Sequence, residues 1–252
     1  MKNTLKARLR QREPLYGLFV MLPSPAGVEM VGYAGFDYAI LDTEHGAAHT
    51  ETIENQLRAA DASGLPALVR TVGPDAGEIL RAMEAGATGV LVPHVTTADD
   101  AAQIVRAAHY PPNGIRGMAT TSRSGKHGVV SVAEHLQNAR ECTIIMVQIE
   151  DAAALPNVSA IARTPGIDAV FIGPADLATS LGFPGQPQHP AVAAAIQKII
   201  DEVREAGQVV AGFARSEEDA AALAGQGVTF ICLSTTLIFS KRLVELAQRL
   251  KQ

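Results

Sequence analysis

Short apolar runs rich in β-branched residues recur along the chain and alternate with alanine-rich segments. Eight runs can be distinguished, at residues 16–22, 36–44, 65–72, 88–95, 142–150, 167–176, 208–216 and 228–236. Apolar runs of this length are typical of strands that are buried on both faces of a parallel sheet. The pattern therefore predicts eight buried strands.

The segments between these runs have apolar residues at helical spacing, for example at residues 49–64, 75–86, 98–110 and 189–207. Several of them end at a glycine, as helix C-termini commonly do. Strands that alternate with helices form right-handed βαβ units in a parallel sheet. Eight units in 252 residues predict an α/β fold, a (β/α)8 TIM barrel that forms a single catalytic domain over residues 1–252. The last helix is expected to pack in an oligomer.

A doubly wound open sheet is the alternative fold. No GxGxxG follows the first run and no GxxxxGK[ST] occurs in the sequence, which weakens its nucleotide-binding version. One long irregular segment, residues 110–128, separates the fourth predicted helix from the fifth strand, and loops of this length are usually functional or disordered.

The composition and charge of the chain argue against a membrane protein, a secreted protein and a nucleic-acid-binding protein. With 47% hydrophobic residues and a net charge of −5, the chain is expected to be globular and soluble. It has no apolar stretch near the roughly 20 residues of a membrane span, and its polar start lacks the centre of a secretory signal. Scattered basic residues and 4% aromatics give no footprint for nucleic acid. A cytoplasmic protein with a small-molecule partner is expected, with Cys142 and Cys232 as reduced, buried thiols.

Polar residues stand where the apolar runs stop. The active site of a (β/α)8 barrel lies at the C-terminal ends of its strands, so these residues are predicted to meet at one mouth. They are Asp42, Glu44, His45, Arg70, His94, Gln148, Glu150 and Asp176.

Glu150 and Asp176 end two neighbouring runs, where a buried charge needs a partner. Gln148 shares a strand face with Glu150, and two carboxylates with an amide suit Mg²⁺ or Mn²⁺, with Co²⁺ also possible. The alternative is that the acids pair with Arg70, or that Asp176 is a helix N-cap. Zinc is disfavoured because no Cys or His accompanies the two acids at ligand spacing.

His45 directly follows the second run and is suited to be a general base, with Asp42 available to orient it or hold its charge. A loop histidine bonded to backbone is the alternative. His45 and His49 lie four residues apart but lack the glutamate of HExxH, so His49 is expected at the surface or at a helix cap. A Schiff-base mechanism is disfavoured because no lysine lies on a predicted strand. The lysines are Lys2, Lys6, Lys126, Lys198, Lys241 and Lys251.

Five motifs carry a resemblance to a known family: GFDYAILDTEHG, LVR at Arg70, YPPNGIRG, VQIED and FIGPADLATSLG. With these motifs the chain resembles, nearly end to end, the metal-dependent pyruvate aldolases of the HpcH/HpaI family. The resemblance implies a barrel assembled into trimers or hexamers, a divalent metal, and reversible aldol cleavage. The products would be an aldehyde and either pyruvate or a close analogue such as hydroxypyruvate.

The resemblance also implies roles for individual residues. Glu150 and Asp176 match metal ligands, and Gln148 and Ala175 match substrate contacts, to which Asp176 and Arg70 also contribute. Arg70 matches the transition-state stabiliser.

The proton acceptor of the family is matched by His45, with Asp42 as an acid near it. Glu84 falls where close relatives carry an aspartate that raises the basicity of the histidine, and its extra methylene puts that role in doubt. Because Glu84 ends a helix far from its own mouth, it can reach a histidine only across an interface. The stretch AGFARS at residues 211–216 departs from the family pattern, so the identity of the substrate is not inherited.

Three other functions fit the same residues. A lyase acting on a CoA thioester would need a basic groove, for which Arg116, Arg123 and Lys126 are the candidates. An oxaloacetate decarboxylase would need the same enolate stabilisation. A barrel that only binds oxo acids would have lost its acid or base, yet His45 and Glu150 are present.

Overall fold

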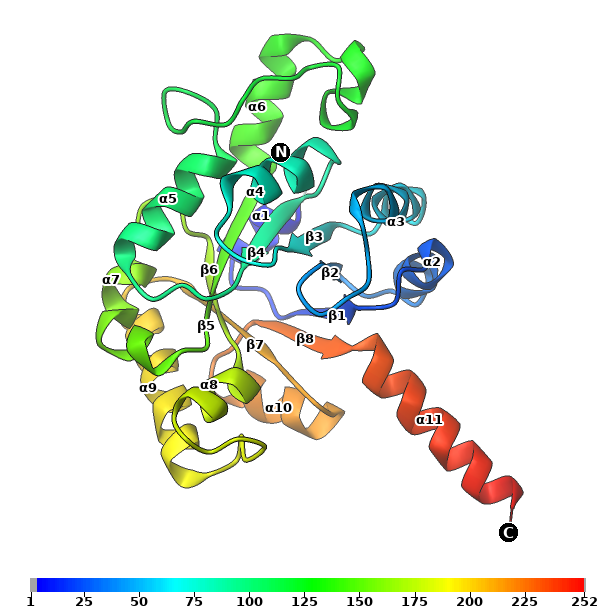
Figure 1. The fold of residues 1–252 in the computed structure, drawn as a ribbon, viewed down its shortest axis with the longest axis vertical. Helices are drawn as coiled ribbons and strands as arrows, with labels where there is room; N and C mark the ends of the chain where they lie inside the picture. The colour runs from blue at the N-terminus through cyan, green and yellow to red at the C-terminus, as the bar shows by residue number, and fades with distance from the viewer. Residues whose placement is uncertain (1–3, 252) are drawn as a thin grey trace.

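Eight parallel strands close into a barrel in the computed structural model, which describes residues 4–251 (Figure 1). Each strand pairs with the next, and the first also pairs with the last. The (β/α)8 barrel with a single domain is confirmed, and the open sheet is wrong. The strands are β1 (Leu15–Val20), β2 (Tyr38–Asp42), β3 (Ala67–Arg70), β4 (Gly89–Val92), β5 (Ile144–Ile149), β6 (Ala169–Ile172), β7 (Val209–Phe213) and β8 (Phe230–Ser234).

Helices follow the strands and surround the barrel (Figure 1). The predicted helical segments correspond to α3, α4, α5 and α9, and side-chain caps fix where some of them begin. Asp75 accepts from the backbone of Glu78 at the start of α4, and Thr97 forms a capping box with Asp100 at the start of α5. The helices are α1 (Leu5–Arg10), α2 (Pro25–Tyr33), α3 (Thr50–Ala62), α4 (Ala76–Glu84), α5 (Ala98–Ala108), α6 (Val132–Cys142), α7 (Val158–Ala162), α8 (Pro174–Ser180), α9 (Pro190–Glu205), α10 (Glu217–Gly225) and α11 (Thr235–Leu250), with short 3-10 turns η1 (Arg123–Gly128) and η2 (Ala152–Asn157).

Alternation along each strand divides its side chains between two apolar layers. On β5, Val147 and Ile149 pack outward against the helices, whereas Ile144 and Met146 fill the barrel interior. Side chains two residues apart share a face of a strand, so the inward row continues through Gln148. Gln148 therefore lies on the inward face of β5, above Met146.

The N-terminal end of the barrel is closed by α1. Leu5 and Leu9 pack into the interior layer, and Lys6 forms a buried ion pair of 2.8 Å with Asp168. Asp168 also accepts from the backbone N–H of Ile145, at 2.9 Å. These contacts leave the opposite end, where the strands finish, as the open end of the barrel.

Two sequence-based expectations about the rest of the chain can be compared with this fold. Cys142 and Cys232 are both free thiols, and Cys232 is buried, where burial raises its pKa. Cys142 is only partly buried. Across residues 4–251, no helix is long and apolar enough to cross a membrane.

Helix α11 extends away from the barrel (Figure 1), and none of its described residues is buried. An amphipathic helix gains most of its stability by packing an apolar face. The exposed apolar side chains of α11 are Leu237, Ile238, Phe239, Leu243, Val244, Leu246 and Leu250. We propose that α11 packs against a second copy of the chain, as the sequence-based expectation of a homo-oligomer requires, because exposed apolar surface of this kind marks contact sites.

The double substitution Phe239→Asp and Leu243→Asp should reduce the mass of the particle, since two charges would enter an apolar contact. Light scattering at equal protein concentration should show an oligomer for the unchanged chain and a smaller species for the variant. Ser240→Asp with Gln248→Asp adds the same charge at polar positions of α11 and should leave the mass unchanged. A monomeric unchanged chain would contradict the proposal.

Candidate active site at the barrel mouth

A cavity of about 300 Å³ opens at the C-terminal ends of the strands. Five of the predicted polar side chains line it together with the Gly173–Pro174–Ala175 turn and several apolar residues. These five are Asp42, His45, Arg70, Gln148 and Asp176. The predicted convergence on one mouth is therefore observed, although the roles of the individual residues remain predictions.

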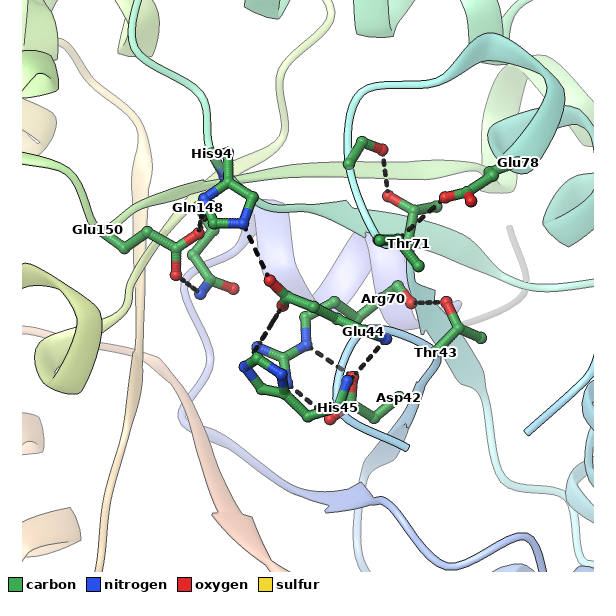
Figure 2. Close-up of polar contacts among 12 residues, drawn as sticks. Asp42, Thr43, Glu44, His45, Arg70, Thr71, Glu78, His94, Gln148 and Glu150 are labelled. Atoms are coloured by element: carbon green, nitrogen blue, oxygen red, sulfur yellow. Dashed lines mark hydrogen bonds and ion pairs between the residues drawn. The ribbon is translucent and has the colours of Figure 1, made fainter. Parts of the chain in front are cut away.

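Arg70 is held between two carboxylates at the end of β3. Its Nε and Nη2 donate to Asp42 at 2.9 and 2.6 Å, and its Nη1 lies 3.0 Å from Glu44 (Figure 2). The ring of Phe19 stacks below the guanidinium at 4.7 Å. Burial lowers the pKa of Arg70, but the hydrogen bonds and charges of these acids outweigh burial and raise it. The result is a fixed positive charge that faces the mouth.

Asp42 also shapes the loop that carries the candidate base. Its Oδ1 accepts from the backbone N–H groups of Glu44 and His45, at 3.1 and 3.3 Å. The imidazole of His45 is 53% exposed, and its Nε2 lies 4.0 Å from Glu44. Asp42 therefore positions His45 through the main chain, and the carboxylate beside the His45 ring is that of Glu44.

His94 lies between two acids from different strand ends. Its Nδ1 is 3.2 Å from Glu150 and its Nε2 is 3.1 Å from Glu44 (Figure 2). Its backbone has a φ of +59°, in the left-handed region, and its N–H donates to Glu150 at 2.9 Å. Such backbone strain is concentrated at functional sites. The ligand atoms of Glu44, His94 and Glu150 lie within 4.8 Å of one another, so these residues can hold a metal ion.

Spacing along the sequence disfavours zinc because no histidine lies near Glu150 in the chain. The structure brings His94 to Glu150 from another strand end, so a nitrogen ligand lies beside this acid. The sequence places Glu44 and His94 at strand ends but does not indicate that their side chains meet. Spacing along one segment cannot reveal contacts between two strand ends.

Glu150 is almost fully buried at the top of the inward row of β5. Burial raises its pKa, while the backbone N–H and the charge of His94 and the Gln148 hydrogen bond oppose this change. The amide nitrogen of Gln148 donates to Glu150, and its buried oxygen has no hydrogen-bond partner among residues 4–251. The oxygen atoms of a buried carboxylate and of an unpaired amide are the ligand type that a hard divalent cation prefers, and the charge of the cation would favour the ionised form of Glu150.

The turn after β6 lies directly against these two side chains. A Cβ at Gly173 would come within 2.9 Å of both Gln148 and Glu150, so only glycine allows this approach. Gly173 is also the N-cap of α8, which places Asp176 in the first helical turn and not at the cap. The N-cap alternative for Asp176 is therefore wrong. Its carboxylate is exposed at the mouth, as is Ala175.

Glu84 lies at the other end of the barrel, just before β4 begins. It accepts from Nη2 and Nε of Arg116 at 2.6 and 3.2 Å, and the guanidinium of Arg116 stacks on Tyr110 at 4.5 Å. Glu84 is thus far from the mouth of its own chain, as the sequence predicted. Its effect on His45 remains untested.

The basic cluster that a CoA-thioester lyase would need lies in the same region, and two of its side chains already have partners. Arg116 is buried beside Glu84, and Arg123 pairs with Asp61 at 2.5 Å while donating to the carbonyl of Ala85. Two of the three cations of the proposed groove are therefore already paired within the chain. The CoA-lyase alternative loses the basic groove that supported it.

Lysine is absent from the described residues that line the mouth. Lys6 is buried at the opposite end, and Lys2 lies outside the described residues. His49 occupies the N-cap position of α3 without a side-chain hydrogen bond. Both findings agree with the sequence-based expectations for these residue types.

Relatives of known name cover nearly the whole chain. A hydroxypyruvate/pyruvate aldolase of Paraburkholderia phytofirmans is 37% identical over 246 residues, which cover 95% of this chain and 94% of the relative. A 4-hydroxy-2-oxo-heptane-1,7-dioate aldolase of Shigella sonnei is 36% identical over 241 residues, which cover 94% of this chain and 91% of the relative. Together with the barrel and its mouth, these similarities define the chain as a carbon–carbon lyase.

The family model for HpcH/HpaI aldolase/citrate lyase matches residues 15–239, and the chain belongs to this family. A family member from Burkholderia cenocepacia has a solved structure with a TM-score of 0.92 and 36% identity, covering 98% and 99% of the two chains. The HpcH/HpaI aldolase of Desulfitobacterium hafniense gives a TM-score of 0.93 at 28% identity, covering 99% and 97%.

Replacing Asp42 by Ala should lower the free energy of unfolding by about 3 kcal/mol, because Arg70 would stay buried with one partner fewer. Urea unfolding at fixed protein concentration measures the change. Glu54→Ala breaks the exposed pair with Arg58 and should cost less than about 1 kcal/mol. Equal losses in the two variants would show that burial of the Asp42 pair is unimportant.

Proposed function

We propose that the protein is a divalent-metal-dependent aldolase that reversibly cleaves a 4-hydroxy-2-oxo acid. The products are pyruvate, or a close analogue such as hydroxypyruvate, and an aldehyde. The observation that carries the proposal is that Arg70 and Gln148, whose amide donates to Glu150, line the same mouth. Cleavage of this bond leaves negative charge on the 2-oxo oxygen of an enolate, which needs such positive charge nearby.

Glu150 and Asp176 are the proposed ligands of Mg²⁺ or Mn²⁺, with Co²⁺ as a further candidate. When bound, the cation would act as a Lewis acid toward the oxo acid. Gln148 would contribute its free amide oxygen. The backbone N–H groups of Ala175 and Asp176, in the first turn of α8, have no partner inside that helix and can receive the substrate carboxylate.

Arg70 would stabilise the developing charge on the 2-oxo oxygen without changing its own position. Asp42 and Glu44 already hold its guanidinium, so little reorganisation accompanies the reaction. His45 would accept the proton of the 4-hydroxyl group as the aldehyde leaves. Its exposed imidazole and its place in the lining of the cavity allow that contact.

The assembly proposed for the chain is a homo-oligomer, a trimer or a hexamer. Glu84 lies at the far end of its own barrel. It can therefore act only on a histidine of another subunit. We also propose that the protein is cytoplasmic. Its partners would be a small-molecule oxo acid and an aldehyde, with no nucleic-acid or membrane partner.

Chelation should abolish pyruvate release from 4-hydroxy-2-oxo acids, and Mg²⁺, Mn²⁺ or Co²⁺ should restore it. Calorimetry with Mn²⁺ identifies the ligands: Asp176→Asn should bind the ion at least tenfold more weakly, whereas His94→Gln should bind it about as well as the unchanged chain, because a hard cation prefers oxygen ligands. Full activity after exhaustive metal removal would contradict the metal proposal. The opposite ranking of the two variants would assign the ion to Glu44, His94 and Glu150.

Replacing His45 by Ala should reduce aldol cleavage by about 10²–10⁴-fold, the usual contribution of a general base. Oxaloacetate decarboxylation forms the same enolate without that proton transfer, so it should fall much less. Both activities should collapse in Glu150→Gln. Parallel assays of pyruvate formation provide the comparison, and equal losses in His45→Ala would show that His45 supports the enolate or the metal instead of the hydroxyl proton.

A further inference from the structure

A second cavity lies at the opposite end of the barrel from the mouth. Its volume is about 610 Å³, compared with about 300 Å³ at the mouth. Ile167 and Asp168 line it immediately before β6, and Gln208 and Val209 line it where β7 begins. The N-terminal helix α1 forms another wall. The aldolase chemistry proposed above makes no use of this cavity.

The charge of this cavity is opposite to that of the whole chain. Its described lining includes four cationic side chains and one carboxylate, whereas the net charge of the protein is −5. The cations are Lys6, Arg10, Arg12 and Arg140, and the acid is Asp168. Local concentration of positive charge against the sign of the net charge attracts anions to this end of the barrel.

The single carboxylate is already engaged. Lys6 lies 2.8 Å from Asp168, and both side chains are nearly fully buried, so they neutralise each other. The backbone N–H of Ile145 also donates to Asp168. Arg10 approaches the same acid only at 3.6 Å and is 65% exposed. The charge that remains for a ligand is therefore that of the arginines.

The arginines come from different parts of the chain and face one space. Arg10 ends α1, and Arg140 lies in the last turn of α6. Arg12 has a φ of +56° and donates from Nη2 to the carbonyl of Gly207 at 2.9 Å, which fixes it at the rim. His109 and Asn113 add hydrogen-bonding groups to the lining.

The floor of the cavity is apolar. Leu9, Val105, Ile167 and Val209 contribute to it, and all four are buried. An inorganic anion alone would gain nothing from this surface. An organic molecule with an apolar part and two or more negative charges would contact both the floor and the arginines.

We propose that this cavity binds a small organic polyanion, either a phosphate ester or a polycarboxylate. Arginine guanidinium groups recognise both carboxylates and phosphates through paired N–H donors. The proposal is independent of the aldolase reaction, because no described side chain is shared between the linings of this cavity and of the mouth.

Calorimetry on the full chain, stripped of metal and then dialysed free of chelator, tests the proposal, since polyanions then cannot bind through a metal at the mouth. The probes are ATP, fructose 1,6-bisphosphate, citrate and inorganic phosphate. At least one organic polyanion should bind more tightly than inorganic phosphate, and added salt should weaken it. Tighter binding of ATP or fructose 1,6-bisphosphate would indicate a phosphate ester as the ligand type, and tighter binding of citrate would indicate a polycarboxylate.

Arg10→Gln with Arg140→Gln should weaken that binding at least tenfold, as should the single charge reversal Arg140→Glu. Arg58→Gln with Lys198→Gln is the matched control, because it removes two positive charges from α3 and α9 outside the cavity, and its affinity should be unchanged. Thermal melting without ligand checks that each variant is folded. Absence of saturable binding, or an equal loss in the control, would overturn the proposal.

Discussion

The geometry of the mouth depends on the buried charge of Arg70. A guanidinium almost withdrawn from water is stable only beside carboxylates, and Asp42 and Glu44 supply two of them within 3.0 Å. Asp42 is then unavailable for other partners except the two N–H groups of the following loop. The same ion pair therefore fixes the arginine, the loop conformation and the place of His45.

Both ends of the barrel hold buried polar side chains, but one end is closed and the other is open. At the N-terminal end, Lys6 and Asp168 form a buried pair below α1, and this end of the interior is closed. At the C-terminal end, Gln148 and Glu150 continue the inward row of β5 but meet a loop and a cavity instead of a helix. Polar groups that would be costly inside the barrel become available to a ligand at this end.

The sequence was sufficient to predict the barrel, because eight continuous apolar runs and the helical spacing between them follow from the packing of strands between two layers. It also identified the polar residues at the strand ends. It was not sufficient to show which of them touch. The pairing of Arg70 with Asp42 depends on the register between β2 and β3, and the contact of His94 with Glu150 depends on a left-handed residue after β4. Neither register nor a positive φ at a histidine follows from a hydrophobic pattern.

The contacts of Glu150 show which polar groups a divalent cation would meet at this carboxylate. One of its oxygens accepts from the backbone and faces the ring of His94, and the other accepts from the amide of Gln148. Each carboxylate oxygen has two lone pairs, so a cation could bind Glu150 beside these donors or in place of one of them. Rotation of the Gln148 amide would replace its donor by the oxygen that now has no partner in the described chain, and the His94 ring, which is 57% exposed, can turn toward solvent. The hydrogen bond from the backbone N–H of His94 depends on neither movement, so the buried Glu150 carboxylate would keep one donor with a cation bound.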